Sequence, residues 1–296
     1  MVALLGFVWG GTFLVIELGL QGMTPFWLAA GRIGFAAGLL GVIWAMRGFS
    51  LFKERPQKSA WFITALIGAL SSAVPFILLS WGQQFVTSGF AGVSMASVSL
   101  LVLPLAHFFV PGEQMSLRKA AGFVIGFAGV CVLIGAQAFE SSGTALETPG
   151  RLACFSAACC YATSTVLMRR LPAVDPIGLA SVLIIFGAAV VIPVAYMVEG
   201  SPPMPDRKTA LIIAFLGLVP TAMASLLRVL VVRSAGPVFM SITGYQVPVW
   251  SVVLGFLILN EPLPSSLLLA LALILAGLGL SQYGPLTRLF RQVRSD

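Results

Sequence analysis

Residues 87–113 have the sequence TSGFAGVSMASVSLLVLPLAHFFVPGE, and residues 235–261 have the sequence AGPVFMSITGYQVPVWSVVLGFLILNE. Both are apolar spans rich in small residues, both contain an internal proline, and both end on a glutamate. Their landmarks are 148 positions apart, and Gly129-Val130 and Gly277-Leu278 downstream keep the same offset (129 + 148 = 277). The two stretches indicate two copies of one unit.

The composition places the chain in a lipid bilayer. Of its 296 residues, 58% are hydrophobic and only 9% are charged, whereas soluble domains carry roughly 25% charged residues. A helix needs about 20 apolar residues to cross the hydrocarbon region. Ten such helices and short connectors account for the whole length, so we predict an all-α polytopic membrane protein.

Apolar runs between breaking residues predict where the ten helices lie. Pro75, Pro104, Pro193, Pro220 and Pro248 fall inside runs and predict bends, since proline removes a helical hydrogen bond. A carbonyl freed at a bend must be satisfied by protein or water, so bends in the fourth and ninth spans favour a cavity there. The predicted spans lie near 2–20, 26–46, 59–80, 89–110, 120–138, 150–170, 176–197, 209–231, 238–259 and 265–283.

The domain organisation follows from five spans in each copy. Because five is odd, the two copies must cross the membrane in opposite orientations, as inverted repeats around a central cavity. Such repeats are typical of secondary transporters, whose substrate site lies near the membrane midplane. The predicted units are a first five-helix repeat over 1–138, a connecting loop over 139–149, a second repeat over 150–283 and a basic cytoplasmic tail over 284–296.

The distribution of Lys and Arg predicts the orientation. If the N-terminus is cytoplasmic, 13 of the 17 basic residues fall on the inner side, Arg32 lies within a span, and Arg151, Arg207 and Lys208 fall outside. Cytoplasmic loops carry the excess of basic residues, so both termini of this multi-pass protein are expected in the cytoplasm. Glu113 is then inside and Glu261 outside, as an inverted pair requires.

Several other classes of function are disfavoured. The net charge of +7 is dispersed among the spans instead of forming one patch, which argues against nucleic-acid binding. The four cysteines match no zinc spacing, and we expect no metal and no cofactor. An intramembrane enzyme would need a nucleophile and base or paired aspartates, but the chain has one histidine, and Asp175, Asp206 and Asp296 lie in predicted loops or the tail.

A series of short motifs resembles a known family. They begin with Trp9-Gly10-Gly11-Thr12-Phe13 and end with Asn260-Glu261. Over nearly the whole chain this order is similar to the drug/metabolite transporter superfamily, EamA type, and most resembles the ten-helix aromatic amino-acid exporters of the YddG type. The intervening motifs are Thr24-Pro25 with Arg32, Thr87-Ser88-Gly89, Gly112-Glu113, Gly129-Val130, Asp175-Pro176 and Pro248.

The resemblance implies an inner-membrane exporter with a central cavity between two five-helix halves. Two departures concern the outer ends of the first helices. Glu17 stands where many relatives carry Lys, and the second copy has no counterpart of Arg32.

Candidate substrate-binding residues lie at mid-span. The polar tips of Trp9, Tyr161 and Tyr245 need partners that lipid cannot supply. These rings either wall an aqueous pocket for a planar substrate or pack with the tip bonded to a neighbour. Small polar residues on the same spans either bind the substrate's polar ends or allow close helix packing. The full set is Trp9, Thr12, Ser94, Ser97, Tyr161, Ser164, Tyr245 and Gln246.

Few ionisable residues lie within the spans. Glu17 and Arg32 are predicted in the same leaflet on consecutive helices, which makes them a candidate ion pair. Arg228, about one turn from the cytoplasmic end of its helix, either extends to water or attracts a substrate carboxylate at the inner mouth. No carboxylate is predicted at mid-membrane, so facilitated export is as compatible with the sequence as proton antiport.

The sequence therefore predicts a secondary transporter that exports small metabolites, aromatic amino acids first, by alternating access. Its expected partners are a small-molecule substrate, either an amino acid or a planar metabolite, and the lipid bilayer. The alternative is a proton-coupled efflux transporter of drugs or cations. The glycine pairs Gly6/Gly10, Gly34/Gly38 and Gly122/Gly126 fit internal helix contacts or a dimer face, which leaves the oligomeric state open.

Overall fold

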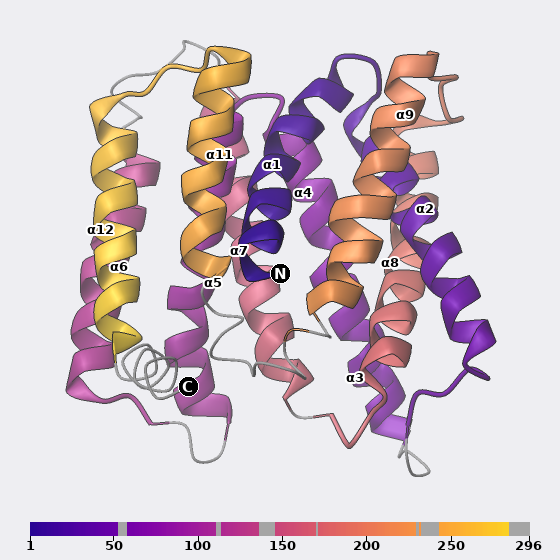
Figure 1. The fold of residues 1–296 in the computed structure, drawn as a ribbon, viewed down its shortest axis with the longest axis horizontal. Coiled ribbons are helices and arrows are strands. Elements are labelled where there is room, and N and C mark those ends of the chain that lie inside the picture. The colour runs from indigo at the N-terminus through magenta and orange to yellow at the C-terminus, as the bar shows by residue number, and fades with distance from the viewer. Residues whose placement is uncertain are drawn as a thin grey trace.

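The computed structural model describes residues 1–52, 58–110, 114–135, 146–169, 171–228, 231 and 243–283. The helices lie side by side in one bundle (Figure 1), which confirms the predicted all-α fold. Among the described residues the sole β contact is an isolated antiparallel bridge between Phe52 and Val174. Glu113 and the basic tail lie outside the described residues.

The helices follow the chain in a simple order. Three pieces in the first half, α3, η1 and α4, make one continuous span, and α9 continues into η3 in the same way. The helices are α1 (Val2–Leu20), α2 (Pro25–Met46), α3 (Lys58–Gly68), η1 (Ala69–Ala73), α4 (Val74–Gly82), α5 (Ser88–Phe109), α6 (Leu117–Gly135), α7 (Glu147–Met168), α8 (Pro176–Glu199), α9 (Arg207–Leu216), η3 (Gly217–Met223), α11 (Thr243–Leu259) and α12 (Ser265–Ser281).

The helices are long and apolar enough for a membrane. Within the described part of the chain, eight helical spans meet the length and hydropathy needed to cross a bilayer, and α11 and α12 are shorter apolar helices. The polytopic membrane fold predicted from hydropathy is therefore confirmed. The expected start of the ninth span, at residue 238, lies outside the described residues, and α11 is described from Thr243 onward.

Two π-helical segments interrupt the third and eighth spans. They begin 148 residues apart, at Ala69 and Gly217 (69 + 148 = 217). Pro220 lies inside η3, and Pro75 follows directly after η1 in the first turn of α4. A proline lacks the N–H that the α-helical ladder needs, and an inserted π turn is one way for a helix to accommodate the gap. The two prolines at which bends are predicted thus lie within or next to π segments.

Pairs of helices from the two halves pack against each other. α2 packs on α8 and α6 on α12, while α1 packs on α11 and α5 on α7. Glycines allow the close approaches: a Cβ at Gly10 would lie 2.5 Å from the Cβ of Trp250, and one at Gly122 would lie 2.7 Å from the backbone nitrogen of Ser281. Gly34 and Gly38, by contrast, have no neighbour within 4 Å.

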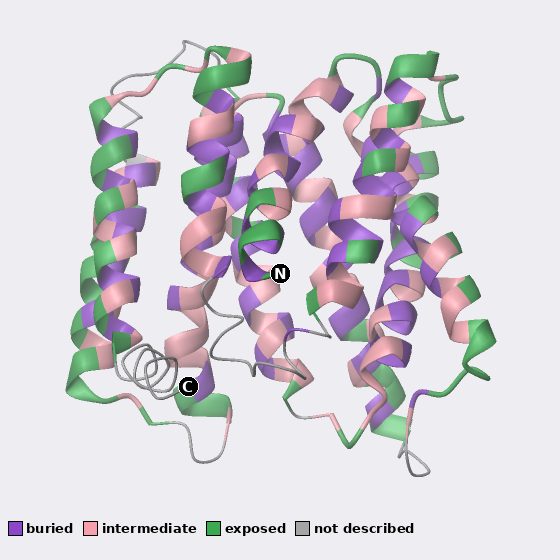
Figure 2. Cartoon of the chain, in the orientation of Figure 1, coloured by how far each residue is buried: buried purple, intermediate pink, exposed green. Residues whose placement is uncertain are grey.

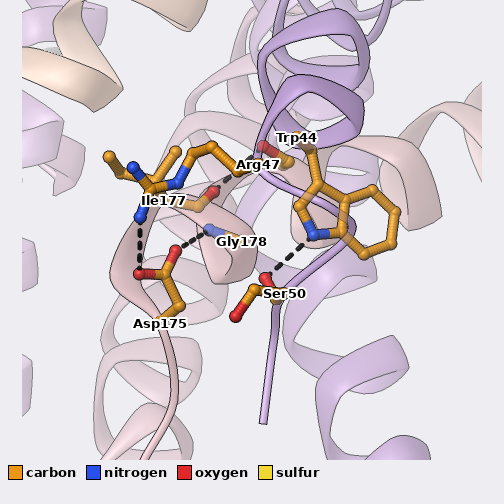
Figure 3. A network of polar contacts seen from close by, with 7 residues as sticks. Trp44, Arg47, Ser50, Asp175, Ile177 and Gly178 are labelled. Atoms are coloured by element: carbon orange, nitrogen blue, oxygen red, sulfur yellow. Dashed lines mark hydrogen bonds and ion pairs between the residues drawn. The ribbon is translucent and has the colours of Figure 1, made fainter. Parts of the chain in front are cut away.

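Polar contacts join α2 and α8 at both ends of the pair. At one end Arg47 pairs with Asp175 at 3.2 Å, and Asp175 also accepts a hydrogen bond from the backbone N–H of Gly178 at 2.8 Å (Figure 3). At the other end Glu199 accepts hydrogen bonds from the backbone N–H groups of Phe26 and Trp27, both at 3.1 Å. Each helix therefore ends where the other begins, and the second and seventh spans run antiparallel.

Buried residues concentrate where helices meet, and exposed apolar residues lie along the outer helix surfaces (Figure 2). One core cluster joins residues of α5, α7, α11 and α12, and another joins residues of α2 and α8. Tyr161 packs against both clusters. Its ring therefore lies at the junction of the two groups of helices.

Candidate functional site

Arg32 is held in the interior of the bundle by two contacts. Its side chain is 7% exposed, and its Nε donates a hydrogen bond to the hydroxyl of Thr221 at 2.8 Å. The guanidinium carbon also lies 4.0 Å from the centre of the Phe76 ring, within the range of a cation–π interaction. The Thr221 hydroxyl in turn donates to the carbonyl of Leu216 at 2.8 Å, so the position of the guanidinium is well defined.

The Arg32 charge lies deep within the helical span. Arg32 is the eighth residue of α2, so its Cα is about 10 Å below the start of that helix. No carboxylate of the described residues forms an ion pair with it, and its two terminal Nη groups have no hydrogen-bond partner among those residues. A charge buried within a membrane span is costly and points to function.

The expected Glu17–Arg32 ion pair is not present among the described residues. Arg32 is turned toward η3, where Thr221 and Phe76 contact its guanidinium. Glu17 lies instead within range of the like charge of Glu261, which follows α11. The two residues share a leaflet in the predicted topology, but they face different neighbours.

The indole of Trp9 is bonded to the same π segment. Its Nε1 donates to the carbonyl of Pro220 at 3.1 Å, and Pro220 directly precedes the Thr221 that anchors Arg32. The polar tip of Trp9 thus has a partner within the protein, which the packing interpretation requires. Trp9 and Arg32 therefore bond to consecutive residues of η3, Pro220 and Thr221.

Tyr161 is the second candidate aromatic residue near Arg32. It is half-buried and packs against the core cluster that includes Phe76, the ring contacted by Arg32. Among the described residues, its hydroxyl has no hydrogen-bond partner. Tyr245 differs, because its hydroxyl is fully buried and also without a described partner, while the neighbouring Gln246 packs against Gly6 of α1.

The predicted small polar residues fall into two groups. The hydroxyls of Thr12, Ser94 and Ser164 each donate to a carbonyl of their own helix, at 2.9 Å in every case. These bonds satisfy the hydroxyls without a ligand. Ser97 is different, since its hydroxyl is completely buried and has no described partner.

A polar cluster that the sequence did not predict lies at the end of α11. Asn260 adopts a left-handed backbone conformation, with φ of 53°, which asparagine tolerates better than most residues. This turn lets the backbone N–H of Glu261 bond to the carbonyl of Gly255 at 3.1 Å. The Glu261 carboxylate then accepts hydrogen bonds from the backbone N–H groups of Ser88, at 2.7 Å, and Gly89, at 3.0 Å, and caps α5.

The remaining predicted site residue, Arg228, lies at the last residue of the eighth span and is exposed. No group of three or more potential metal-binding side chains occurs among the described residues. The polar groups brought together in the interior are therefore Arg32, Thr221, Trp9 and Tyr161.

The chain is similar to several curated transporters along most of its length. It is 29% identical over 272 residues to YedA of Escherichia coli K12, named an uncharacterized inner membrane transporter, covering 90% of this chain and 84% of that one. It is 23% identical over 278 residues to the uncharacterized transporter YoaV of Bacillus subtilis, covering 93% of each chain. It is also 26% identical over 270 residues to a protein of Streptantibioticus cattleyicolor named a probable terminal-alkyne amino-acid exporter, covering 91% and 88%.

A solved crystal structure has the same fold. It matches with a TM-score of 0.63 and 22% identity, and the match covers 96% of this chain and 98% of that one. The profile of the EamA-like transporter family matches this sequence twice, over residues 1–135 and 148–282. The chain belongs to the EamA-like transporter family and is therefore a membrane transporter, not an enzyme.

Proposed function

We propose that this transporter exports amino acids with apolar side chains, aromatic ones first, and that Arg32 binds the substrate carboxylate. The observation that carries the proposal is the buried guanidinium, which is fixed through its Nε and leaves its terminal nitrogens without described partners. An arginine fork matches a carboxylate through two parallel hydrogen bonds. In an apolar setting such a charge-assisted contact is strong and selective.

The aromatic part of the substrate would lie against the rings near Arg32. Trp9 reaches the adjacent residue of η3, and Tyr161 packs against the core cluster that includes Phe76. Rings of this kind stack on planar groups or meet them edge to face. The Tyr161 hydroxyl, without a described partner of its own, provides a further hydrogen bond for the substrate.

The proposed membrane position follows the distribution of basic residues. Both termini lie in the cytoplasm, the protein spans the cytoplasmic membrane, and alternating access moves the substrate between the two sides. The name of the Streptantibioticus cattleyicolor relative, an amino-acid exporter, supports this substrate class. Efflux of cationic drugs through the same site is disfavoured, because Arg32 would repel a cation and no described carboxylate neutralises it.

Counterflow in proteoliposomes tests the proposal. Exchange of labelled phenylalanine should be inhibited by unlabelled phenylalanine and tryptophan, less by threonine, and hardly by phenylalaninamide, which lacks the carboxylate. Arg32→Gln should lower phenylalanine counterflow about 30-fold or more, as expected when one partner of a buried charge pair is removed. Arg118→Gln is the matched control, since Arg118 is exposed and lies 5.1 Å over the Tyr283 ring, away from η3.

Three results would contradict this assignment. Phenylalaninamide or a quaternary ammonium ion could compete as well as phenylalanine, or Arg32→Gln could retain full counterflow. Counterflow could also be absent for every amino acid in the panel. If Arg32→Gln fails to fold, Thr221→Val provides the second variant, because it removes only the hydroxyl that positions the guanidinium.

A further inference from the structure

Three buried oxygens without a described hydrogen-bond partner lie where α1, α4 and α5 meet the end of α11. They are Oε2 of Glu17, Oε1 of Gln83 and the hydroxyl oxygen of Ser88. Gln83 is 1% exposed and Ser88 is completely buried. Buried polar atoms are nearly always hydrogen-bonded in native proteins, so a group of three requires a physical explanation.

Contacts bring these oxygens together with a fourth group, the Glu261 carboxylate. The side-chain amide of Gln83 donates to the carbonyl of Phe13 at 2.9 Å, one helical turn before Glu17. The backbone N–H of Ser88 donates to Glu261 at 2.7 Å. The hydroxyl of Ser88 lies 2.9 Å from the position of a Cβ at Gly255, and an oxygen of Glu261 contacts the same position.

The two carboxyl groups have different surroundings. Glu261 accepts two backbone hydrogen bonds at the start of α5, where the helix dipole favours a negative charge. Glu17 has a buried oxygen without a described donor, and the charge of Glu261 acts on it. A second buried negative charge beside the capping carboxylate of Glu261 is unfavourable, so a proton on Glu17 would remove the repulsion between the two groups.

A proton fits this cluster better than a metal cation. Protonation removes the charge of Glu17 and gives the cluster a donor for an acceptor such as Oε1 of Gln83. A sodium ion would instead face the positive end of the α5 dipole. Both oxygens of Glu261 already accept backbone hydrogen bonds, which makes them poorer ligands for a metal.

Other charged or titratable groups on the helices around α1 are directed elsewhere. Arg32 of α2 bonds to Thr221, and Arg207 and Lys208 are exposed at the start of α9. His107 lies in the last turn of α5, at the end opposite Ser88. Tyr245 of α11 lies next to Gln246, which contacts Gly6 near the other end of α1. Among the described residues, Glu261 is therefore the titratable group that acts on Glu17.

We propose that Glu17 is a proton-binding site that controls opening between α1, α5 and α11. With the proton bound, Glu17 is neutral and the packing of α1 against α5 and α11 is kept. Loss of the proton leaves two carboxylates in one apolar junction, and their repulsion separates α1 from α5 and α11. The inference rests on the proposed export function in one respect: opening at this end, which the predicted topology places outside, would release the substrate.

Carbodiimide labelling tests the proton site without any transport assay. Dicyclohexylcarbodiimide reacts with protonated carboxyl groups in apolar surroundings, and peptide mass spectrometry locates the adduct. In the full-length protein in liposomes, Glu17 should be labelled at about pH 6 and at least about tenfold less at about pH 9, whereas Glu261 should remain unlabelled. Glu17→Gln should abolish the adduct, and Asp206→Asn, which changes an exposed acid at the start of α9, should not affect it.

The labelling result can overturn the proposal in two ways. Glu17 could remain unlabelled over the whole pH range, or sodium at constant pH could protect it, which would identify an alkali cation as the ligand. Replacing the cap, Glu261→Gln, should shift the labelling of Glu17 toward lower pH, because it removes the neighbouring negative charge. An unchanged pH midpoint in a folded Glu261→Gln protein would show that the two carboxyl groups are not coupled.

Transport measurements test the role in opening. Phenylalanine counterflow by the unmodified protein should slow by about threefold or more when the pH falls from about 8.5 to about 6, because the protonated junction stays closed. Glu17→Gln should remove that dependence, and Asp206→Asn should keep it. Counterflow that is robust but independent of pH would overturn the control of opening. Absence of counterflow for all substrates would instead overturn the proposed function and leave the labelling result as a separate finding.

Discussion

The π segments η1 and η3 begin at corresponding positions of the two copies but have different neighbours. In η3, Pro220 accepts a hydrogen bond from Trp9, and Thr221 accepts one from Arg32. The corresponding residues of η1 are Ser72 and Ala73 (220 − 148 = 72; 221 − 148 = 73). The same distortion of the backbone thus occurs twice, but it positions a buried charge only once. The scaffold is repeated, and the candidate substrate site is not.

The side chains around the two segments explain this asymmetry. Arg32 is the eighth residue of α2, and the eighth residue of α8 is Leu183 (176 + 7 = 183), whereas Phe76 corresponds to Ala224 (76 + 148 = 224). The first-half residues make the polar and cation–π contacts, whereas their counterparts have aliphatic side chains that can make neither. Substitutions at equivalent positions of η1 and η3 should therefore have comparable structural effects but unequal effects on transport.

The largest difference between substitutions at η1 and at η3 is expected at the glycines that bring these segments close to α8 and α2. A Cβ at Gly217 would lie 2.5 Å from the Cβ of Phe35 and 2.6 Å from the carbonyl oxygen of Arg32. A Cβ at Gly68 would lie 2.8 Å from the Cβ of Phe186 and 2.9 Å from a backbone oxygen of α8. Alanine at either position should lower the free energy of unfolding by about 1–3 kcal/mol, which is the usual cost of overpacking.

Only Gly217→Ala should also impair transport, because it displaces the backbone of Arg32. We expect a loss of phenylalanine counterflow of about tenfold at equal amounts of folded protein, with Gly68→Ala as the matched control. Thermal unfolding in detergent and counterflow in liposomes measure the two effects separately. Equal transport by the two variants would show that the position of Arg32 is unimportant.

A comparable loss of transport is expected at the hydroxyl that holds Arg32. Thr221→Val removes the acceptor for Nε while keeping a similar side-chain shape, and a hydrogen bond to a charged group is worth about 1.5–3 kcal/mol. Phenylalanine counterflow should fall about tenfold or more. Ser72→Ala, at a buried position of η1, should change phenylalanine counterflow less than about twofold. A larger loss of counterflow in Ser72→Ala than in Thr221→Val would place the substrate site at η1.

A smaller effect is expected at Trp9. Trp9→Phe removes the donor to Pro220 but keeps an aromatic ring, so counterflow should fall about fivefold, equivalent to about 1 kcal/mol. Trp250→Phe is the control, because that indole is 36% exposed and packs edge-on against Phe7. Trp9→Ala should weaken phenylalanine transport more than threonine transport. Equal loss for both substrates would show that the ring only packs.

The smallest effect concerns the start of the helix that leads into η3. Hydrogen bonds from Thr209, mainly through its hydroxyl and then its backbone N–H, hold the pKa of Asp206 below its ordinary value. The lowered pKa means that the carboxylate stabilises the fold above the ordinary pKa, and this contribution disappears as the pH falls through the lowered value. Asp206→Ala should therefore lower the melting temperature slightly at neutral pH and have no effect in strong acid. A loss that persists in acid would contradict the role of the charge.

The positions of the spans could be predicted because hydropathy reports them directly. The predicted span 176–197 corresponds to α8 (Pro176–Glu199), and the predicted span 265–283 corresponds to α12 (Ser265–Ser281). The prolines predicted bends in the third and eighth spans. Their π form could not be predicted, because it depends on which distant side chains accept or donate hydrogen bonds at the distorted turn.

The partners of the site residues were harder to predict. Hydropathy and topology indicate the depth of a residue in the membrane, but not which neighbouring helix it faces. The sequence predicts Glu17 and Arg32 in the same leaflet, but Arg32 bonds to Thr221 and Glu17 lies within range of the charge of Glu261. Thr221 is 189 residues away from Arg32 in the chain, and no local pattern connects the two.

The capping of helices by distant glutamates has a consequence for biosynthesis. The first turns of α2 and α5 are synthesised early, but their hydrogen-bond acceptors are Glu199 and Glu261. A nascent chain that has inserted only its first five helices must therefore leave these backbone N–H groups to water or lipid headgroups. The ribosome has to synthesise nearly the whole polypeptide before these early helices have all their hydrogen-bond acceptors. The last hydrogen bonds to form are therefore those at the first turns of helices that entered the membrane early.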